Sequence, residues 1–241
     1  MDLAVIILAG GKGKRMNSPL PKVLQLVGGV PMIKRIVDTV QKLNPVKIIA
    51  VVSPEIQKQI ALILPALTLV VQPRSTGTGD AVRWALPEIP IHSTVCILNS
   101  DTPLITSETL SEILQAYPGH LQFTALYSSS PTGCGRILLE NNKFSRIVEE
   151  KDCTVVQKKI NLINCGIYVS SKEILERGLP LVEDNNAARE YYITDIGKVA
   201  LRLGYPVHLH ILPPEKEKEM VNVNTLEQLN IINKWSAGIT K

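Results

Sequence analysis

The sequence predicts an α/β fold with a doubly wound, mostly parallel sheet. Apolar runs of strand length recur along the chain, and segments with helical periodicity separate the early ones. Strands that alternate with helices are joined by right-handed crossovers, which set neighbouring strands parallel. Ligands on such sheets bind at the carboxyl ends of strands, so the loops that follow strands are the candidate functional segments.

Each element follows from its own pattern. Apolar runs predict strands over residues 4–9, 47–52, 67–71, 94–98, 122–127, 136–139, 163–169 and 207–212. Helical periodicity predicts helices over 32–43 and 78–86, with helix-like stretches at 194–203 and 225–235. Strands crowd together after about residue 121, which indicates an inserted second lobe. We expect one domain, 1–241, with one lobe over about 1–120 plus 220–241 and the other over about 121–219.

Composition restricts the class of partner. The chain has 241 residues, 45% of them hydrophobic, and a net charge of +4 spread along its length. Basic residues cluster at Lys12, Lys14, Arg15 and Lys22 without the aromatic residues that single-stranded nucleic acid would need, so we expect no nucleic-acid partner. The run VIILA is too short for a membrane span, and the four cysteines lack CxxC spacing, so we expect reduced thiols in the cytoplasm and no membrane partner.

The loop LAGGKGKRM, residues 8–16, follows the first predicted strand and combines three glycines with three cations. A dinucleotide fingerprint would need glycine where Met16 stands, and a P-loop would need Ser or Thr where Arg15 stands. Permissive backbone flanked by positive charge still predicts a bound polyphosphate.

Together with Leu20-Pro21-Lys22-Val23-Leu24, this loop resembles that of sugar nucleotidyltransferases. Further motifs narrow the resemblance to the N-acetylglucosamine-1-phosphate uridyltransferase family, the N-terminal half of the bifunctional enzyme that makes UDP-N-acetylglucosamine. They are Gln72 with TGTGDAV, SDTPLI (100–105), PTGCGRI (131–137), IVEEKDCT (147–154), INCGIYV (163–169), NNAAREYYITD (185–195) and VNVN (221–224). The resemblance implies a Rossmann-like sheet with an inserted sugar-binding lobe, of the nucleotide-diphospho-sugar transferase type.

The resemblance implies a Mg²⁺-dependent reaction of UTP with N-acetylglucosamine 1-phosphate, by in-line attack without a covalent intermediate. Catalysis of this kind depends on positioning and charge neutralisation. The resemblance assigns catalytic roles to Arg15, at the β,γ-phosphates, and Lys22, at the α-phosphate, although either could be a solvated surface charge. The nucleotide-binding residues that it implies are Leu8, Gly10, Gly11, Gly13, Gln72, Gly77 and Thr78.

The resemblance also implies that Asp101 and Asn224 hold the metal, two oxygen ligands of the kind Mg²⁺ takes. Alternatively, Asp101 is a turn residue or helix cap, and Asn224 caps the helix that begins TLEQL. The implied sugar-binding residues are Gly135, Glu149, Asn164, Thr194 and, more weakly, Tyr192. Glu149 could instead be an exposed acid, Asn164 a strand-edge residue and Tyr192 part of the core.

Several positions depart from the family pattern. Gly10 stands where alanine is common, Asn99-Ser100 replaces an aromatic-glycine pair, Cys134 replaces a tyrosine, and Arg189 stands where glycine is usual. Another hexose 1-phosphate, another NTP, or a catalytically silent nucleotide-sugar-binding protein therefore remain alternatives. No hexapeptide repeats occur, so we expect neither acetyltransferase activity nor a β-helix-mediated trimer; any other oligomer is left open.

Overall fold

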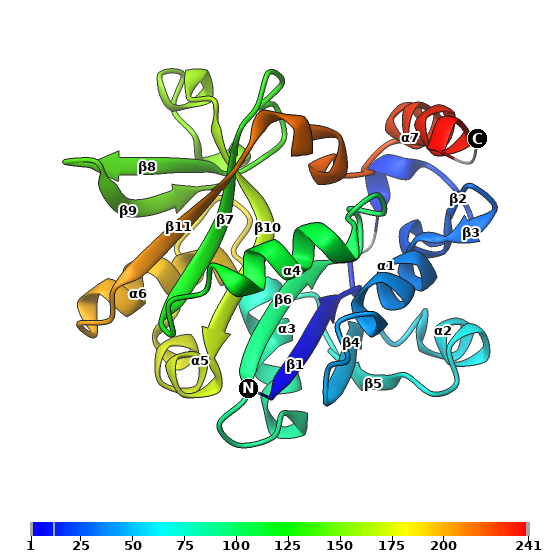
Figure 1. The fold of residues 1–241 in the computed structure, drawn as a ribbon, viewed down its shortest axis with the longest axis horizontal. Coiled ribbons are helices and arrows are strands. Elements are labelled where there is room, and N and C mark those ends of the chain that lie inside the picture. The colour runs from blue at the N-terminus through cyan, green and yellow to red at the C-terminus, as the bar shows by residue number, and fades with distance from the viewer. Residues whose placement is uncertain (1, 12, 240–241) are drawn as a thin grey trace.

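A computed structural model describes residues 2–11 and 13–239. Its centre is one nine-stranded sheet in the order β11-β7-β10-β6-β1-β4-β5, with β8 paired to β10 and β9 paired to β8 (Figure 1). The strands are β1 (Leu3–Leu8), β4 (Lys47–Val52), β5 (Thr68–Val71), β6 (Thr94–Asn99), β7 (Leu121–Tyr127), β8 (Arg136–Glu140), β9 (Lys143–Val148), β10 (Leu162–Ser171) and β11 (Val207–Leu212). A separate two-stranded sheet joins β2 (Leu26–Val27) to β3 (Val30–Pro31).

Helices cover both faces of the large sheet. One face packs against α1 (Met32–Gln41), α2 (Gln57–Ile63) and α4 (Ser107–Gln115). The other packs against α3 (Thr78–Ala85), α5 (Lys172–Gly178) and α6 (Ile196–Arg202). Because both faces are covered, β1 is a nearly continuous buried run rather than an alternating one. This arrangement confirms the predicted doubly wound α/β fold.

Strand direction places the candidate loops together. β1 runs parallel to β4 and β6, and β4 runs parallel to β5. Leu8 lies opposite both Val51 and Asn99, so the carboxyl ends of these strands reach the same level. The loops after β1, β5 and β6 therefore meet at one edge of the sheet, as the sequence predicts.

The structure differs from the sequence-based expectation in the direction of one strand and in several elements that were not predicted. β10 runs antiparallel to both neighbours, β6 and β7, so the sheet continues without a break through both predicted lobes. In addition, β9, α2, α4 and α5 were not predicted. Strand β9, with sequence KFSRIV, has neither a continuous apolar run nor a regular polar–apolar alternation, so its pattern does not indicate a strand.

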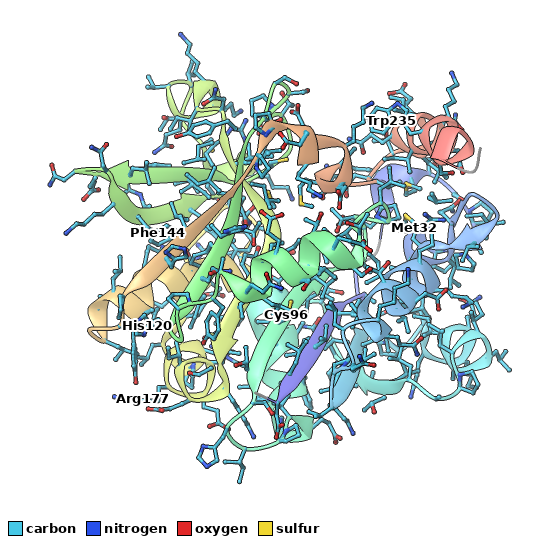
Figure 2. The ribbon with its side chains drawn as sticks, viewed as in Figure 1. Met32, Cys96, His120, Phe144, Arg177 and Trp235 are labelled. Atoms are coloured by element: carbon cyan, nitrogen blue, oxygen red, sulfur yellow. The ribbon has the colours of Figure 1, made fainter. Side chains whose placement is uncertain are left out.

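The last helix, α7 (Leu226–Ile239), closes a small separate core beside β2 and β3. This core joins segments far apart in sequence: Met16, Val27, Met32, Leu104, Val223, Leu229 and Ile232. Figure 2 shows Trp235 and Met32 on this flank of the molecule and Phe144 in the other lobe. The core thus joins the segment after the glycine loop to the segment that carries Asn224.

A membrane-crossing helix would need more length and more apolar character than any helix within residues 2–11 and 13–239 possesses.

Candidate active site

A cleft of about 610 Å³ opens at the carboxyl ends of β1, β5 and β6. Its volume suits a ligand the size of a nucleotide. It is lined by every residue predicted for the nucleotide, the catalytic cations and the metal: Leu8, Gly10, Gly11, Gly13, Arg15, Lys22, Gln72, Gly77, Thr78, Asp101 and Asn224. The predicted sugar residues do not line it and form an adjoining cluster. Lys12, from the predicted basic cluster, lies outside the described residues.

The glycine loop is shaped to let Lys22 approach it. Gly13 has a φ of +56°, in the left-handed region, and a Cβ placed there would lie 2.7 Å from Cβ of Lys22. Its carbonyl accepts a hydrogen bond of 2.8 Å from the Met16 N–H, which closes the turn η1 (Lys14–Met16). Only glycine satisfies both requirements, and the result brings the loop and Lys22 into direct contact.

Four charged or polar groups meet at one end of the cleft. The Lys22 ammonium donates to Asp101 Oδ2 at 2.6 Å and to Asn224 Oδ1 at 3.0 Å. Arg15 Nη2 donates to the same Asn224 oxygen at 3.1 Å. Residues separated by as many as 209 positions therefore meet at a single point.

Local hydrogen bonds test the helix-cap alternatives for Asn224 and Asp101. Thr225 and Gln228 form the capping box of α7: the Gln228 N–H donates to Thr225 Oγ1 at 3.2 Å, and the Thr225 N–H donates to Gln228 Oε1 at 3.1 Å. Asn224 is therefore not the cap. The Val223 N–H donates to the Asp101 carbonyl at 2.7 Å, which holds Asn224 beside Asp101. The side chain of Asp101 pairs with Lys22, and its backbone lies in the turn after β6, as one of the alternatives stated.

The pair Asp101 and Asn224 fits a hard divalent cation. Asp101 Oδ1 is buried and has no hydrogen-bond partner among the described residues. A cation could supply the partner that this carboxylate oxygen lacks. With Asp101 Oδ2 and Asn224 Oδ1, this oxygen makes a set of oxygen donors, the ligand type that Mg²⁺ prefers. No group of three or more His, Cys, Asp or Glu side chains suited to a metal occurs within the described ranges. Phosphate oxygens and water would have to complete the coordination.

Gln72 is held so that its carbonyl oxygen faces the cleft. Its amide nitrogen donates to Asp80 Oδ2 at 2.9 Å and to the Gly77 carbonyl at 3.0 Å. Because a carboxylate only accepts, the Asp80 contact fixes which end of the amide is the nitrogen. Gln72 Oε1 then lies beside Gly10, 3.7 Å from where a Cβ would stand. That oxygen can accept from the N–H of a uracil ring.

The TGTG turn is packed against the second lobe. Gly77 has a φ of +120°, and a Cβ there would lie 2.5 Å from the Tyr191 carbonyl oxygen. The Gly79 N–H donates to that carbonyl at 2.7 Å, the Tyr191 N–H donates to the Thr76 carbonyl at 2.8 Å, and the Ile193 N–H donates to Thr78 Oγ1 at 3.0 Å. The Thr78 hydroxyl is thus engaged within the protein, and the turn joins the two predicted lobes.

The predicted sugar residues form a second, less exposed cluster. Thr194 Oγ1 donates to Glu149 Oε1 at 2.9 Å, and a Cβ on Gly135 would lie 3.4 Å from Glu149 Oε2. Burial raises the pKa of Glu149, and the carboxylates of Asp195 and Asp152 add to the shift. Glu149 is therefore not a freely solvated acid. Burial also raises the pKa of Tyr192, so its hydroxyl stays protonated.

Asn164 stands where β10 changes register with β7, between Asn164 and Tyr168. Its amide nitrogen donates to the Tyr168 hydroxyl at 2.9 Å, and its oxygen accepts from the Gly166 N–H at 3.1 Å. Gly166 has a φ of +72°, and a Cβ there would lie 2.5 Å from Nδ2 of Asn99, a cleft residue. This irregularity in β10 brings the sugar cluster up against the cleft.

The sequence did not reveal the part that Arg136 plays. Its side chain is 1% exposed, donates to the Ile160 carbonyl at 3.0 Å, and pairs with Glu150 Oε2 at 2.8 Å. Glu150 also accepts from the Gly133 N–H at 3.0 Å. Arg136 therefore fixes the loop before Gly135 and the segment after Glu149. Buried arginine in an apolar strand is too uncommon for a sequence pattern to predict.

Two further cleft residues come from the second lobe, Lys151 and Glu190. Lys151 is exposed and lies two positions after Glu149, within the charged run EEKD. A charged run is usually a solvated surface, so the run alone gave no reason to select it. The sequence feature that could have identified Lys151 is its position two residues after Glu149, a predicted sugar-binding residue.

The structure shows the surroundings of three residues that depart from the family pattern. Ser100 Oγ donates to the Leu8 carbonyl at 2.9 Å, so its hydroxyl is used within the sheet edge. Cys134 is partly buried, and burial raises the pKa of its thiol to about 11. Arg189 has a φ of +53° and keeps the left-handed backbone that glycine would adopt most easily. The loop that holds Arg189 is supported by Asn186 Oδ1, which accepts from the Ala188 and Glu190 N–H groups, both at 3.2 Å.

Comparison with known proteins agrees with this geometry. Residues 5–161 match the model of the MobA-like NTP transferase domain. The chain is 45% identical to a protein of Acanthamoeba polyphaga mimivirus named "probable UDP-N-acetylglucosamine pyrophosphorylase", over 97% of this chain and 96% of that one. It is 40% identical to the bifunctional protein GlmU of Neisseria meningitidis serogroup B, over 86% of this chain and 45% of that protein. The chain thus spans about half the length of this bifunctional relative.

A solved structure supports the fold independently of close sequence similarity. A provisionally assigned glucose-1-phosphate thymidylyltransferase from Bacillus anthracis superposes with a TM-score of 0.76 at 19% identity, over 97% of this chain and 95% of that one. At this identity the likeness concerns the fold alone. With the family model and the relatives above, it follows that the chain belongs to the MobA-like NTP transferases and, within them, to the N-acetylglucosamine-1-phosphate uridyltransferase family.

Proposed function

We propose that the protein transfers a uridylyl group from UTP to N-acetylglucosamine 1-phosphate, forming UDP-N-acetylglucosamine and releasing pyrophosphate. The observation that carries the proposal is the convergence of Arg15, Lys22, Asp101 and Asn224 at one end of a cleft floored by a glycine loop. A site with two cations, a carboxylate and permissive backbone suits two polyanions that must approach each other.

In this proposal the chain binds and orients the two substrates and neutralises their phosphate charge. It supplies no nucleophile. The sugar 1-phosphate oxygen attacks the α-phosphorus of UTP in line, and the bond to the pyrophosphate oxygen breaks. Arg15 grips the β,γ-phosphates as a planar fork, and Lys22 reaches the α-phosphate as a point charge. Asp101 and Asn224 would hold Mg²⁺, which supplies further neutralisation of phosphate charge when bound.

The base and the sugar are recognised by different surfaces. Gln72 Oε1 accepts from the uracil N–H, and main-chain groups of Gly77 and Thr78 face the base. Glu149 and Asn164 bind sugar hydroxyls, with Gly135 allowing close approach of the ring. Lys151, a cation from the second lobe, also lines the cleft, and we assign it to the sugar phosphate. We thus assign about 1–120 plus 220–241 to the nucleotide and about 121–219 to the sugar.

A substrate panel tests this function. Pyrophosphate release should be measured with four nucleoside triphosphates and with N-acetylglucosamine, glucose and galactosamine 1-phosphates, each with Mg²⁺ and with excess EDTA. We expect release that requires UTP, the N-acetylated sugar phosphate and the metal together. Release with every sugar phosphate at equal rates would reject the proposed sugar, and failure with all combinations would reject the reaction.

One observation favours a second sugar. Asn99 and Cys134 stand in place of aromatic residues beside the sugar cluster, which removes surface that an acetamido group or pyranose face could contact. If another hexose 1-phosphate gives the higher kcat/KM in the panel, this change is the reason. Calorimetric binding of UDP-sugar without turnover of any pair would instead indicate a silent binding protein.

The cysteines bear on the compartment. All four, Cys96, Cys134, Cys153 and Cys165, are free thiols, and Cys96 and Cys165 are buried. Free thiols fit a reducing compartment, and we propose the cytoplasm.

A further inference from the structure

The Lys22 ammonium occupies the position between Asp101 and Asn224 where a metal ion would bind. The Lys22 ammonium bonds to Asp101 Oδ2 at 2.6 Å and to Asn224 Oδ1 at 3.0 Å. Arg15 bonds to the same Asn224 oxygen at 3.1 Å, so both lone pairs of that amide oxygen have a donor. Two of the oxygens that could ligate a metal ion are therefore already bound to cations.

Charge opposes the entry of a free divalent ion into this arrangement. Two positive side chains, Lys22 and Arg15, already bond to oxygens of the Asp101–Asn224 pair, in which Asp101 supplies the one negative charge. The Lys22 and Asp101 side chains are 13% and 12% exposed, so solvent screens little of the repulsion that an added divalent ion would meet. A triphosphate brings the missing negative charge. It also offers Lys22 a new partner, which is needed because a largely buried ammonium is not left unpaired.

The glycine loop links binding of the triphosphate to release of Lys22 from the metal position. Lys22 packs against Gly13, where a Cβ would lie 2.7 Å from its own Cβ, so phosphates bound on the loop arrive next to the Lys22 side chain. Asp101 Oδ1 is already buried without a partner among the described residues and is ready to ligate as soon as Lys22 leaves. The exchange keeps Asp101 paired with a cation before and after.

We infer that Lys22 is the resident counter-ion of the metal position, and that a divalent metal binds tightly only together with the nucleoside triphosphate that draws Lys22 away. The ligand that the free protein selects is then the metal–nucleotide complex rather than the free metal. This inference rests on the proposed function, because it takes the cleft to be a triphosphate site.

Mn²⁺ serves as the probe, with unbound ion measured by electron paramagnetic resonance. Wild type, Lys22→Met and Lys34→Met are titrated alone and with α,β-methylene-UTP, after subtraction of Mn²⁺ bound by the analogue itself. Lys22→Met keeps the apolar stem against Gly13 and removes the charge. Lys34→Met is the matched control, because it removes a lysine whose partner Asp38, at 2.8 Å, lies on the exposed face of α1.

Without nucleotide, we expect Lys22→Met to bind Mn²⁺ about tenfold or more tightly than wild type, and Lys34→Met to match wild type. Adding Asp101→Asn to Lys22→Met should remove the gain, which locates the ion. We also expect the analogue to tighten Mn²⁺ binding to wild type by about tenfold or more. Equal Mn²⁺ affinity of wild type with and without the analogue overturns the inference, and that comparison decides even if Lys22→Met does not fold.

The two proposals fail separately. Turnover by wild type with no gain in Mn²⁺ affinity in Lys22→Met rejects the role of Lys22 and leaves the reaction standing. A gain in Mn²⁺ affinity without turnover of any substrate pair rejects the reaction and leaves the counter-ion role standing.

Discussion

The two sides of the candidate site, proposed for the nucleotide and for the sugar, differ in how their polar groups are arranged. On the nucleotide side, glycine backbone and two cations line the cleft, and Lys22 and Arg15 share Asn224, a partner that a phosphate could replace. On the sugar side, polar groups are enclosed and already satisfy one another, as Thr194 does with Glu149 and Tyr168 with Asn164.

The difference follows from the ligands. A triphosphate needs charge and close backbone approach, and it tolerates partners that rearrange. A sugar hydroxyl is neutral, so its recognition depends on acceptors and donors held in fixed directions by neighbouring groups. Substitutions on the nucleotide side should therefore act mainly through charge and backbone geometry, and those on the sugar side through positioning and protonation.

The largest effect is expected for Asp101→Asn. It removes the carboxylate that meets Lys22, Arg15 and Asn224 at one end of the cleft, so kcat/KM for UTP should fall by about a thousandfold. The control is Asp38→Asn, the same change in an exposed ion pair with Lys34 on α1, which should leave kcat/KM unchanged. A loss in both variants, or a melting temperature lowered in Asp101→Asn alone to below the assay temperature, would mean that the effect is not local.

Gly13→Ala tests whether backbone geometry serves the nucleotide side. The new Cβ would meet Lys22 Cβ at 2.7 Å with φ at +56°, so we expect kcat/KM for UTP to fall by about ten- to a hundredfold. Gly119→Ala is the control, because its φ is +90° but nothing lies within 4 Å of the added methyl. It should lower the melting temperature and leave kcat/KM as in wild type. Equal kinetic losses in the two variants would show that strain alone, not the contact with Lys22, is responsible.

Glu149→Gln tests the sugar side through protonation. Burial holds the pKa of Glu149 above its ordinary value of 4.5, so the folded protein keeps this proton to a higher pH than the unfolded chain. The stability that this provides is full below pH 4.5 and is lost as pH rises through the raised pKa. Relative to wild type, the variant should therefore gain unfolding free energy as pH rises, by about 1 kcal/mol or less.

Chemical denaturation of both proteins at several pH values measures that gain. In the same variant, KM for the sugar phosphate should rise about tenfold while KM for UTP stays constant, because the change replaces a carboxyl group that lies only on the proposed sugar side. A pH-independent difference in stability would contradict the buried protonation, and a rise in KM for UTP would contradict the separation of the two sides.

The smallest effect is expected for Arg189→Gly. Arg189 holds a φ of +53°, which glycine adopts without a steric penalty, but glycine also loses more chain entropy on folding. The net result should be a gain of at most about 1 kcal/mol in unfolding free energy, measured by urea denaturation. His92→Gly, at a φ of +65°, is the control for a residue in the same backbone region. A loss in Arg189→Gly alone would mean that the arginine side chain makes stabilising contacts.

The sequence predicted the nucleotide side more completely than the sugar side. Arg15, Lys22 and Asp101 stand in loops after apolar strands, and parallel strands bring such loops to one edge, so their meeting follows from topology. The sequence could not foresee that Lys22 would bond to both Asp101 and Asn224, because that depends on contacts across 79 and 202 positions.

The sugar side depends on features that have no local signature. The register change beside Asn164, the burial of Arg136 and the exposure of Lys151 all arise from how β8, β9 and β10 pack together. β9 escaped prediction because KFSRIV has no regular strand pattern. α4 carried a signal that was missed: Thr106 is an N-cap residue, and Leu110, Ile113 and Leu114 follow i, i+3, i+4 spacing.

Because the small core beneath α7 needs residues from the end of the chain, the candidate active site can be completed only late in folding. Asn224 and three members of the core around Met16 (Val223, Leu229 and Ile232) lie beyond residue 220, whereas the central strands β1, β4 and β6 are complete by residue 99. During synthesis the sheet can form early, with Lys22 and Asp101 in place but without their third partner. Capacity for chemistry would then arise only when the last helix docks, which makes α7 a checkpoint on maturation.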